Sequence, residues 1–265
     1  MKRADGEVAA GMTSLVDRTV TALRAEHDAL ATLLPELDLS TPSGASEWTI
    51  AQVLSHLGSG AEIMLSPVRR AAGESVPPPD AQAVWARWDA ASPIEQAAGF
   101  VEHDERFVST VESLSEEERA SLLVDLGFLP QPVPLVVALG MRLNEVANHT
   151  WDVRAGVDPA TEVAADSAAV LAELFTGPLA FLLGFAAKAD QVTEPVRLAV
   201  PGGGVVIGES VSVVPSLPDP TATMSGPLGA TVRLVSGRLR SPYDAAVSVS
   251  GNVSLDDLRR VFPGF

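Results

Sequence analysis

The chain contains no cysteine among its 265 residues. It can therefore form neither a disulfide nor a thiol nucleophile of its own, so any thiol in its chemistry has to arrive with a ligand. Aromatic residues are also scarce, at 5%, although 46% of the residues are hydrophobic. Aliphatic side chains must fill most of the core, and the length is sufficient for two domains with a sizeable core.

Basic residues are few, with 18 Lys and Arg against 34 Asp and Glu and a formal net charge of −16. This charge repels nucleic acid and anionic lipid, so we expect neither as a partner. Most of the basic residues are arginine, which suits bidentate binding of carboxylates but also follows from a GC-rich genome. We expect a small anionic ligand to need a local arginine. The sequence leaves a monomer and a small homo-oligomer open.

Targeting and membrane segments are not evident in the sequence. Residues 1–13 begin with basic residues but lack an apolar run, so we predict a disordered tail and, by default, a cytoplasmic location. The apolar stretch 170–187 is interrupted by Glu173 and by Gly177-Pro178. The segments between these interruptions are too short to cross a membrane, so we predict two buried helices instead of a membrane span.

Apolar residues recur at helical spacing through the first two thirds of the chain. The predicted helical regions cover 14–37, about 49–65, 81–114 with a break near Ser92-Pro93, about 134–155, and 166–187 as a fifth element. Thr49 followed by Gln52 predicts a capping box at the start of the second helix. His27 occupies a core position of the first helix, and His56 lies at the edge of the apolar face of the second. An antiparallel bundle over 14–187 follows.

From about residue 190 the sequence changes to short β-branched runs separated by Gly and Pro. The predicted extended runs are 196–214, 222–226, 230–239 and 245–251. Ser254 is the predicted N-cap of a final helix. The sequence therefore predicts an α+β protein of two domains, with a helical bundle followed by a small α+β domain over 190–265.

Glu145 and His149 lie four residues apart in the fourth helix, which places a carboxylate and an imidazole on one face. His56 could meet them inside the bundle and complete a three-ligand metal site with an open coordination position. Such ligands suit Zn²⁺ and also Fe(II). The spacing also arises by chance, and a lone histidine near a helix face is more often hydrogen-bonded in the core, so both interpretations stay open.

Other polar residues nearby carry two interpretations each. Arg142 either binds a substrate carboxylate or pairs with Glu145. Asp152 either orients a ligand residue or is an ordinary helix charge. His27 either supports the metal site or is a hydrogen-bonded core residue. His103 lies in a charged stretch and is predicted to face solvent.

Two stretches, "EWTIAQVLSHL" at 47–57 and "NEVANHTWDV" at 144–153, resemble signatures of the mycothiol-dependent maleylpyruvate isomerase family. These signatures are Trp-Thr-x-x-x-Val-x-x-His-Leu and Glu-x-x-x-His-x-x-Asp. The likeness extends over nearly the whole chain, because "VSVSGNVSLDDLRRVF" at 247–262 is similar to the end of that family's second domain. The resemblance implies a DinB-like metal-binding four-helix bundle, a sterol-carrier-like α+β domain, and zinc ligands at His56, Glu145 and His149.

The resemblance also implies that mycothiol, a low-molecular-weight thiol, supplies the sulfur that the chain lacks. The expected activity is mycothiol-dependent isomerisation or S-transfer on a small electrophile, with Zn²⁺ or another divalent metal. Arg142 or Arg238 would hold a carboxylate of that substrate. Two alternatives remain open: a zinc-water hydrolase, which would lack an evident general base, and a non-catalytic metal-containing binding or scaffold protein.

Overall fold

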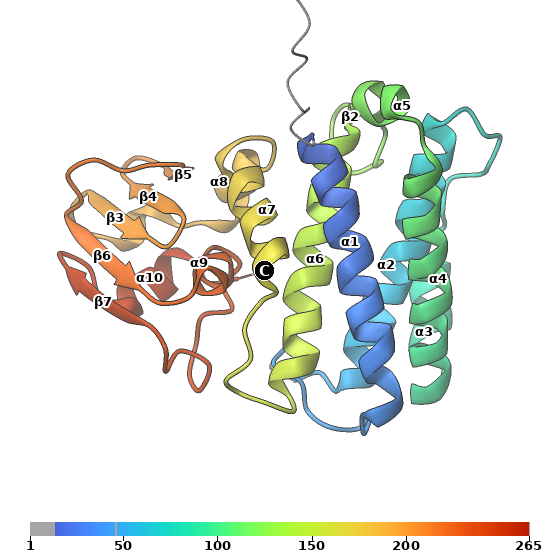
Figure 1. Ribbon diagram of the computed structural model, residues 1–265, viewed down its shortest axis with the longest axis horizontal. Helices are drawn as coiled ribbons and strands as arrows, with labels where there is room; N and C mark the ends of the chain where they lie inside the picture. The colour runs from blue at the N-terminus through green and yellow to red at the C-terminus, as the bar shows by residue number, and fades with distance from the viewer. Residues whose placement is uncertain (1–13, 46, 265) are drawn as a thin grey trace, which may run out of the picture.

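The computed structural model describes residues 14–45 and 47–264. The predicted tail, 1–13, lies outside the described residues. Figure 1 shows two parts side by side, long helices from the first part of the chain and a sheet with short helices from its end. The predicted α+β class and the order of its two parts are confirmed.

Helices make up the first part, and their bounds follow the predicted regions closely. They are α1 (Leu15–Leu33), the 3-10 turn η1 (Leu34–Glu36), α2 (Ile50–Ala71), α3 (Ala81–Asp89), α4 (Pro93–Ser113), α5 (Glu116–Ser121) and α6 (Leu135–Ala155). The short strands β1 (Leu123–Val124) and β2 (Val133–Pro134) pair antiparallel before α6. At the start of α2 the predicted capping box forms, since Thr49 N–H donates to Gln52 Oε1 at 2.9 Å and Gln52 N–H donates to Thr49 Oγ1 at 3.3 Å.

Aliphatic side chains fill the bundle core, as the shortage of aromatic residues requires. Leu23, Leu54, Leu57 and Leu139 are each at most 1% exposed. Burial of one such side chain contributes about 1.5–3 kcal/mol. Helix α2 packs against α4 and α6, and α1 packs against α6 and α4. This packing turns one side of α2 towards α6.

The segment between the two parts is a series of short helices. It contains α7 (Ala165–Thr176), the 3-10 turn η2 (Ala180–Leu182), α8 (Leu183–Ala186) and the 3-10 turn η3 (Ala189–Gln191). In the described part of the chain, no single helix is both long and apolar enough to cross a membrane. The pair Ala165–Thr176 and Ala180–Ala186 reaches that composition together but is bent by 75° at its break.

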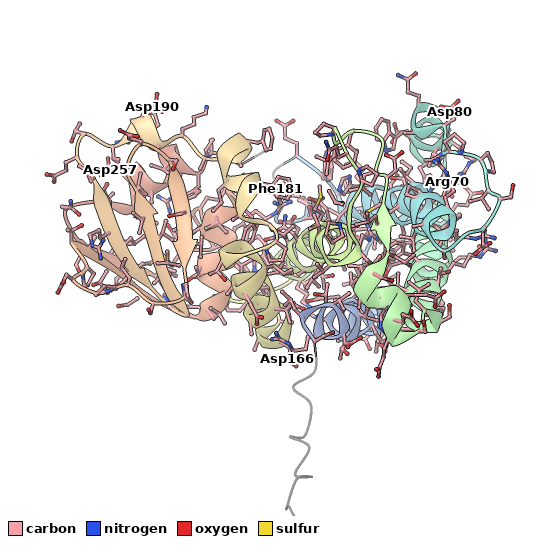
Figure 2. All side chains as sticks on the ribbon, turned by 90° about the horizontal axis from the view of Figure 1, so that it is seen from above. Arg70, Asp80, Asp166, Phe181, Asp190 and Asp257 are labelled. Atoms are coloured by element: carbon pink, nitrogen blue, oxygen red, sulfur yellow. The ribbon has the colours of Figure 1, made fainter. Side chains whose placement is uncertain are left out.

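The last part of the chain forms a five-stranded sheet with two short helices. Its elements are β3 (Val196–Val200), β4 (Gly203–Ile207), β5 (Val211–Val214), β6 (Ala222–Ser225), α9 (Leu228–Val235), β7 (Ser248–Gly251) and α10 (Leu255–Val261). The strand order is β5-β4-β3-β6-β7, and β3 with β6 is parallel while the other pairs are antiparallel. The N-cap at Ser254 forms as predicted. Seen from above in Figure 2, Asp257 lies on this part and Asp80 at the opposite end of the molecule.

The prediction of an extended run over 230–239 is wrong. The structure forms helix α9 there, and its residues from Gly229 to Val235 are all buried. A segment buried on every side has no polar face, so its periodicity cannot distinguish a helix from a buried strand. Helix α9 packs against α7. Tertiary burial therefore overrides the β propensity of Thr231, Val232 and Val235.

Candidate metal centre

The structure brings His56, Glu145 and His149 together, with one donor atom of each within 4.8 Å of the others. His56 comes from α2, and the other two come from successive turns of α6. Glu145 Oε2 lies 2.9 Å from His56 Nε2 and 3.5 Å from His149 Nε2. The two imidazole ring centroids are 4.7 Å apart. A carboxylate and two imidazole nitrogens that converge in this way suit a divalent ion such as Zn²⁺.

The three donors differ in exposure. The side chain of His149 is 6% exposed, whereas those of His56 and Glu145 are 38% and 42% exposed. A site built in this way is anchored on its inner side and open on its outer side. It holds three protein donors and leaves space for a further ligand, which is the pattern of catalytic rather than structural zinc sites.

The ionisable side chains of the site shift one another's pKa. Desolvation alone would raise the pKa of Glu145, but hydrogen bonds and charge from His149 and His56 hold that pKa well below its usual value. Desolvation alone would lower the pKa of His149, but contacts with Asp152 and Glu145 raise it. The carboxylate is therefore kept ionised, as cation binding requires, whereas each imidazole has to lose its proton before it can bind a metal, so protons and the metal compete for the histidines.

Asp152 fixes the position of His149 from behind. Its side chain is fully buried, and its Oδ2 lies 2.8 Å from His149 Nδ1, although off the line of an ideal N–H hydrogen bond. Arg238 Nε donates to the same oxygen at 3.2 Å. A carboxylate at Nδ1 leaves Nε2 as the nitrogen directed towards Glu145, an arrangement that orients metal-binding histidines.

Trp48 covers the two imidazoles from the loop before α2. Its ring lies 5.3 Å from that of His56 and 5.8 Å from that of His149, with the latter pair stacked at 20°. Sequence reasoning assigned no function to Trp48. Its place in the Trp-Thr signature, eight residues before His56, was the available signal.

A cavity of about 380 Å³ opens beside His149, and we call it the basic cavity. Its lining includes Glu47, Trp48, Arg238 and Arg240. Arg238 reaches His149, with its Nη2 3.2 Å from Nε2, and Arg240 Nη2 donates to the Gly44 carbonyl at 2.8 Å. Among the described residues that line this cavity, the guanidinium groups of Arg238 and Arg240 outnumber the one carboxylate, that of Glu47, so the cavity favours a small anion despite the acidic protein. Arg240 was not singled out in the sequence.

Arg142 does not take either of its predicted roles. Its side chain is 2% exposed, and its Nη2 donates to Asp104 Oδ1 at 2.7 Å and to the Leu57 carbonyl at 2.8 Å. Both expectations, a pair with Glu145 and a contact to substrate, are wrong. Arg142 lies on the flank of α6 that faces α2 and α4, and the buried carboxylate of Asp104 on α4 neutralises it there.

His27 lies outside the group of metal-binding candidates. Its Nδ1 is 2.9 Å from Asp104 Oδ2 and its Nε2 is 3.2 Å from Glu105, and its side chain is 5% exposed. It is thus a paired core histidine. Asp104 joins it to Arg142 in one buried network, which neither histidine spacing nor apolar periodicity could reveal.

His103 does not face solvent freely, contrary to prediction. Its side chain is 19% exposed and packs edge-on against Trp88, with ring centroids 5.5 Å apart. Burial lowers its pKa. Helix α3 folds back over α2, which places Trp88 on this otherwise polar face of α4.

Comparison with known proteins places the chain in a family. The family described as mycothiol maleylpyruvate isomerase N-terminal domain matches residues 20–154. The chain belongs to this family. Its candidate metal residues, His56, Glu145 and His149, all lie within the matched range.

This member of the mycothiol maleylpyruvate isomerase family is also similar to solved structures in fold and to curated proteins in sequence. Crystal structures of the mycothiol-dependent maleylpyruvate isomerase and of a mutant of it are similar in fold, with a TM-score of 0.61 for each, 21% and 20% identity, and coverage of 91% of this chain and 98% of theirs. Two uncharacterized proteins of Mycobacterium tuberculosis, from strains CDC 1551 / Oshkosh and ATCC 25618 / H37Rv, are 31% identical over 140 residues, or 52% of this chain. The match spans 66% of the length of these curated relatives.

Proposed function

We propose that this protein is a zinc-dependent enzyme that uses mycothiol to attack a small electrophile, as an isomerase or an S-transferase. The observation that carries the proposal is the convergence of His56, Glu145 and His149 beside a cavity with two arginines. Family membership supports the thiol. The lack of cysteine is consistent with a sulfur nucleophile that arrives as a cofactor.

Each protein group has a distinct task in this proposal. When bound, a divalent ion would lower the pKa of a coordinated thiol and hold it as a thiolate at neutral pH. His56, Glu145 and His149 would hold that ion, and Asp152 keeps the His149 ring in its orientation. Trp48 packs beside the two imidazole rings. Arg238, in the adjacent cavity, offers a positive charge to a carboxylate of the electrophile.

The proposal is tested by measuring metal content and thiol-dependent turnover in the same preparations. Wild-type protein is expected to contain one zinc ion per chain. It is expected to isomerise an electrophilic acid, or to transfer a thiol to it, only when mycothiol is present, and maleylpyruvate is the first acid to test. His149→Ala is expected to lose both the metal and the turnover. His103→Ala is the matched control, because it removes a histidine outside the site.

Two outcomes would contradict the proposal. Full zinc occupancy in His149→Ala would show that the metal binds elsewhere. Stoichiometric zinc in the wild type without any effect of mycothiol on binding or turnover would favour the scaffold or hydrolase alternatives.

A further inference from the structure

A second cavity borders the candidate metal ligands at His56. It measures about 410 Å³, and we call it the polar cavity. Its lining includes His56 together with Gln52, Ser55, Ser59, Trp85 and Asp89. Among the described residues, Trp48 alone lines both the polar and the basic cavity. The candidate metal centre is therefore bordered by two cavities, one at His149 and one at His56, and Trp48 lines both.

Polar side chains that line the polar cavity have donors and acceptors available for further hydrogen bonds. The hydroxyl of Ser55 makes no hydrogen bond to another described residue, although Ser55 is only 6% exposed. Gln52 uses its Oε1 in the capping box, which leaves its amide N–H groups available. Asp89 adds a carboxylate to the same lining. Donors and acceptors thus face the same space.

Two indole rings border this cavity without being needed for the core. Trp85 is 51% exposed and Trp48 is 37% exposed. Trp88, one turn beyond Trp85 on α3, is 4% exposed and already anchors that helix, donating from its Nε1 to Glu62 at 2.9 Å. A half-exposed tryptophan beside a polar cavity is the notable feature, because large apolar rings are normally buried unless they meet a ligand or partner.

The charge of the two cavities differs. No Lys or Arg lines the polar cavity among the described residues, whereas the basic cavity contains Arg238 and Arg240. An anion would gain no counter-charge in the polar cavity and would meet Asp89. A neutral polyhydroxylated ligand fits it better, since ring C–H faces can stack on indole while hydroxyl edges bond to amide, hydroxyl and carboxylate groups.

We infer that the polar cavity binds the sugar and inositol portion of mycothiol, and that the anionic electrophile enters by the basic cavity. The inference rests on the proposed function for the identity of the thiol. Mycothiol joins an N-acetylated cysteine to glucosaminyl-inositol, which is neutral and rich in hydroxyls. With this unit beside Trp85, the cysteine end can reach past His56 to the candidate metal ligands, where its sulfur meets the electrophile that enters from the basic cavity.

The experiment compares three probes on the zinc-loaded full chain by calorimetric titration: mycothiol, N-acetylcysteine, and N-acetylglucosaminyl-inositol, which has the sugar but no thiol. Trp85→Ala and Asp89→Asn are each expected to weaken the binding of mycothiol and of the sugar probe by more than twofold and by up to about tenfold, the scale of one stacking face or hydrogen bond. Binding of N-acetylcysteine is expected to stay within twofold. Phe185→Ala, which removes a 78% exposed aromatic ring on α8, is the control and should change none of the three.

The probes separate failure of this inference from failure of the proposed function. Mycothiol affinity and turnover that are unaffected in both variants would overturn the inference and leave the proposed function intact. Equal weakening of N-acetylcysteine and mycothiol would also overturn it, because the effect would then act at the metal. Trp85-dependent binding of the sugar probe without any thiol-dependent turnover would support the cavity assignment and refute the proposed reaction.

Discussion

Replacement of Asp152 by Asn tests how the protein positions His149. Asp152→Asn keeps the size of a fully buried side chain but removes the negative charge that lies 2.8 Å from His149 Nδ1 and 3.2 Å from Arg238 Nε. Loss of a carboxylate behind a metal-binding histidine typically weakens metal affinity by about 10- to 100-fold. That range corresponds to about 1.4–2.7 kcal/mol of binding free energy. We expect a change within it.

The assay is a competition for Zn²⁺ between the protein and a fluorescent chelator of known affinity, at fixed pH and salt. Circular dichroism on the same samples verifies that Asp152→Asn is folded. Asp166→Asn, an exposed residue at the start of α7, is the control for removal of one negative charge and is expected to bind Zn²⁺ like the wild type. Equal affinity of wild type and Asp152→Asn would refute the positioning argument. An equal loss in both variants would attribute the effect to net charge.

Two further predictions concern buried charges in the bundle. Asp104→Ala leaves Arg142 buried without its carboxylate, so we expect a loss of about 3–5 kcal/mol in urea unfolding. Burial alone would raise the pKa of Asp104, but Arg142 and His27 hold that pKa below 3.8. The contribution of the Asp104 carboxylate to the free energy of unfolding is therefore complete above pH 3.8 and is lost as pH falls through the pKa of the folded state. Asp104→Asn should remove this part of the pH dependence of stability. Burial raises the pKa of Glu26 although Ser167 donates a hydrogen bond to its carboxylate. Ionisation of Glu26 therefore costs folding free energy as pH rises above 4.5, so Glu26→Gln should be more stable relative to wild type at pH 7 than at pH 4. The opposite trend in the urea midpoints would contradict this prediction.

Local signals in the sequence were sufficient for the helices of the bundle and for two of the three metal-binding candidates. The capping box of Thr49 and Gln52 and the break at Ser92-Pro93 act within a few residues, so the chain itself sets these helix ends. Glu145 and His149 share a face because any α-helix places residues four apart on one side. His56 was predicted to join them because it lies at the edge of the apolar face of the second helix and in a signature that resembles a known family.

Long-range packing decided the features that sequence reasoning missed. Arg142 has its partner, Asp104, on another helix 38 residues away, and no local pattern distinguishes that carboxylate from Glu145. Helix α9 forms where β-branched residues favour a strand, because it is buried on all sides against α7 and the sheet part. The two cavities around Trp48 likewise depend on how α3 and the last part of the chain pack beside α2 and α6. Helix starts follow from hydrogen bonds between neighbours in sequence, whereas the pairing of buried charges and the shape of a cavity depend on residues that meet only after folding.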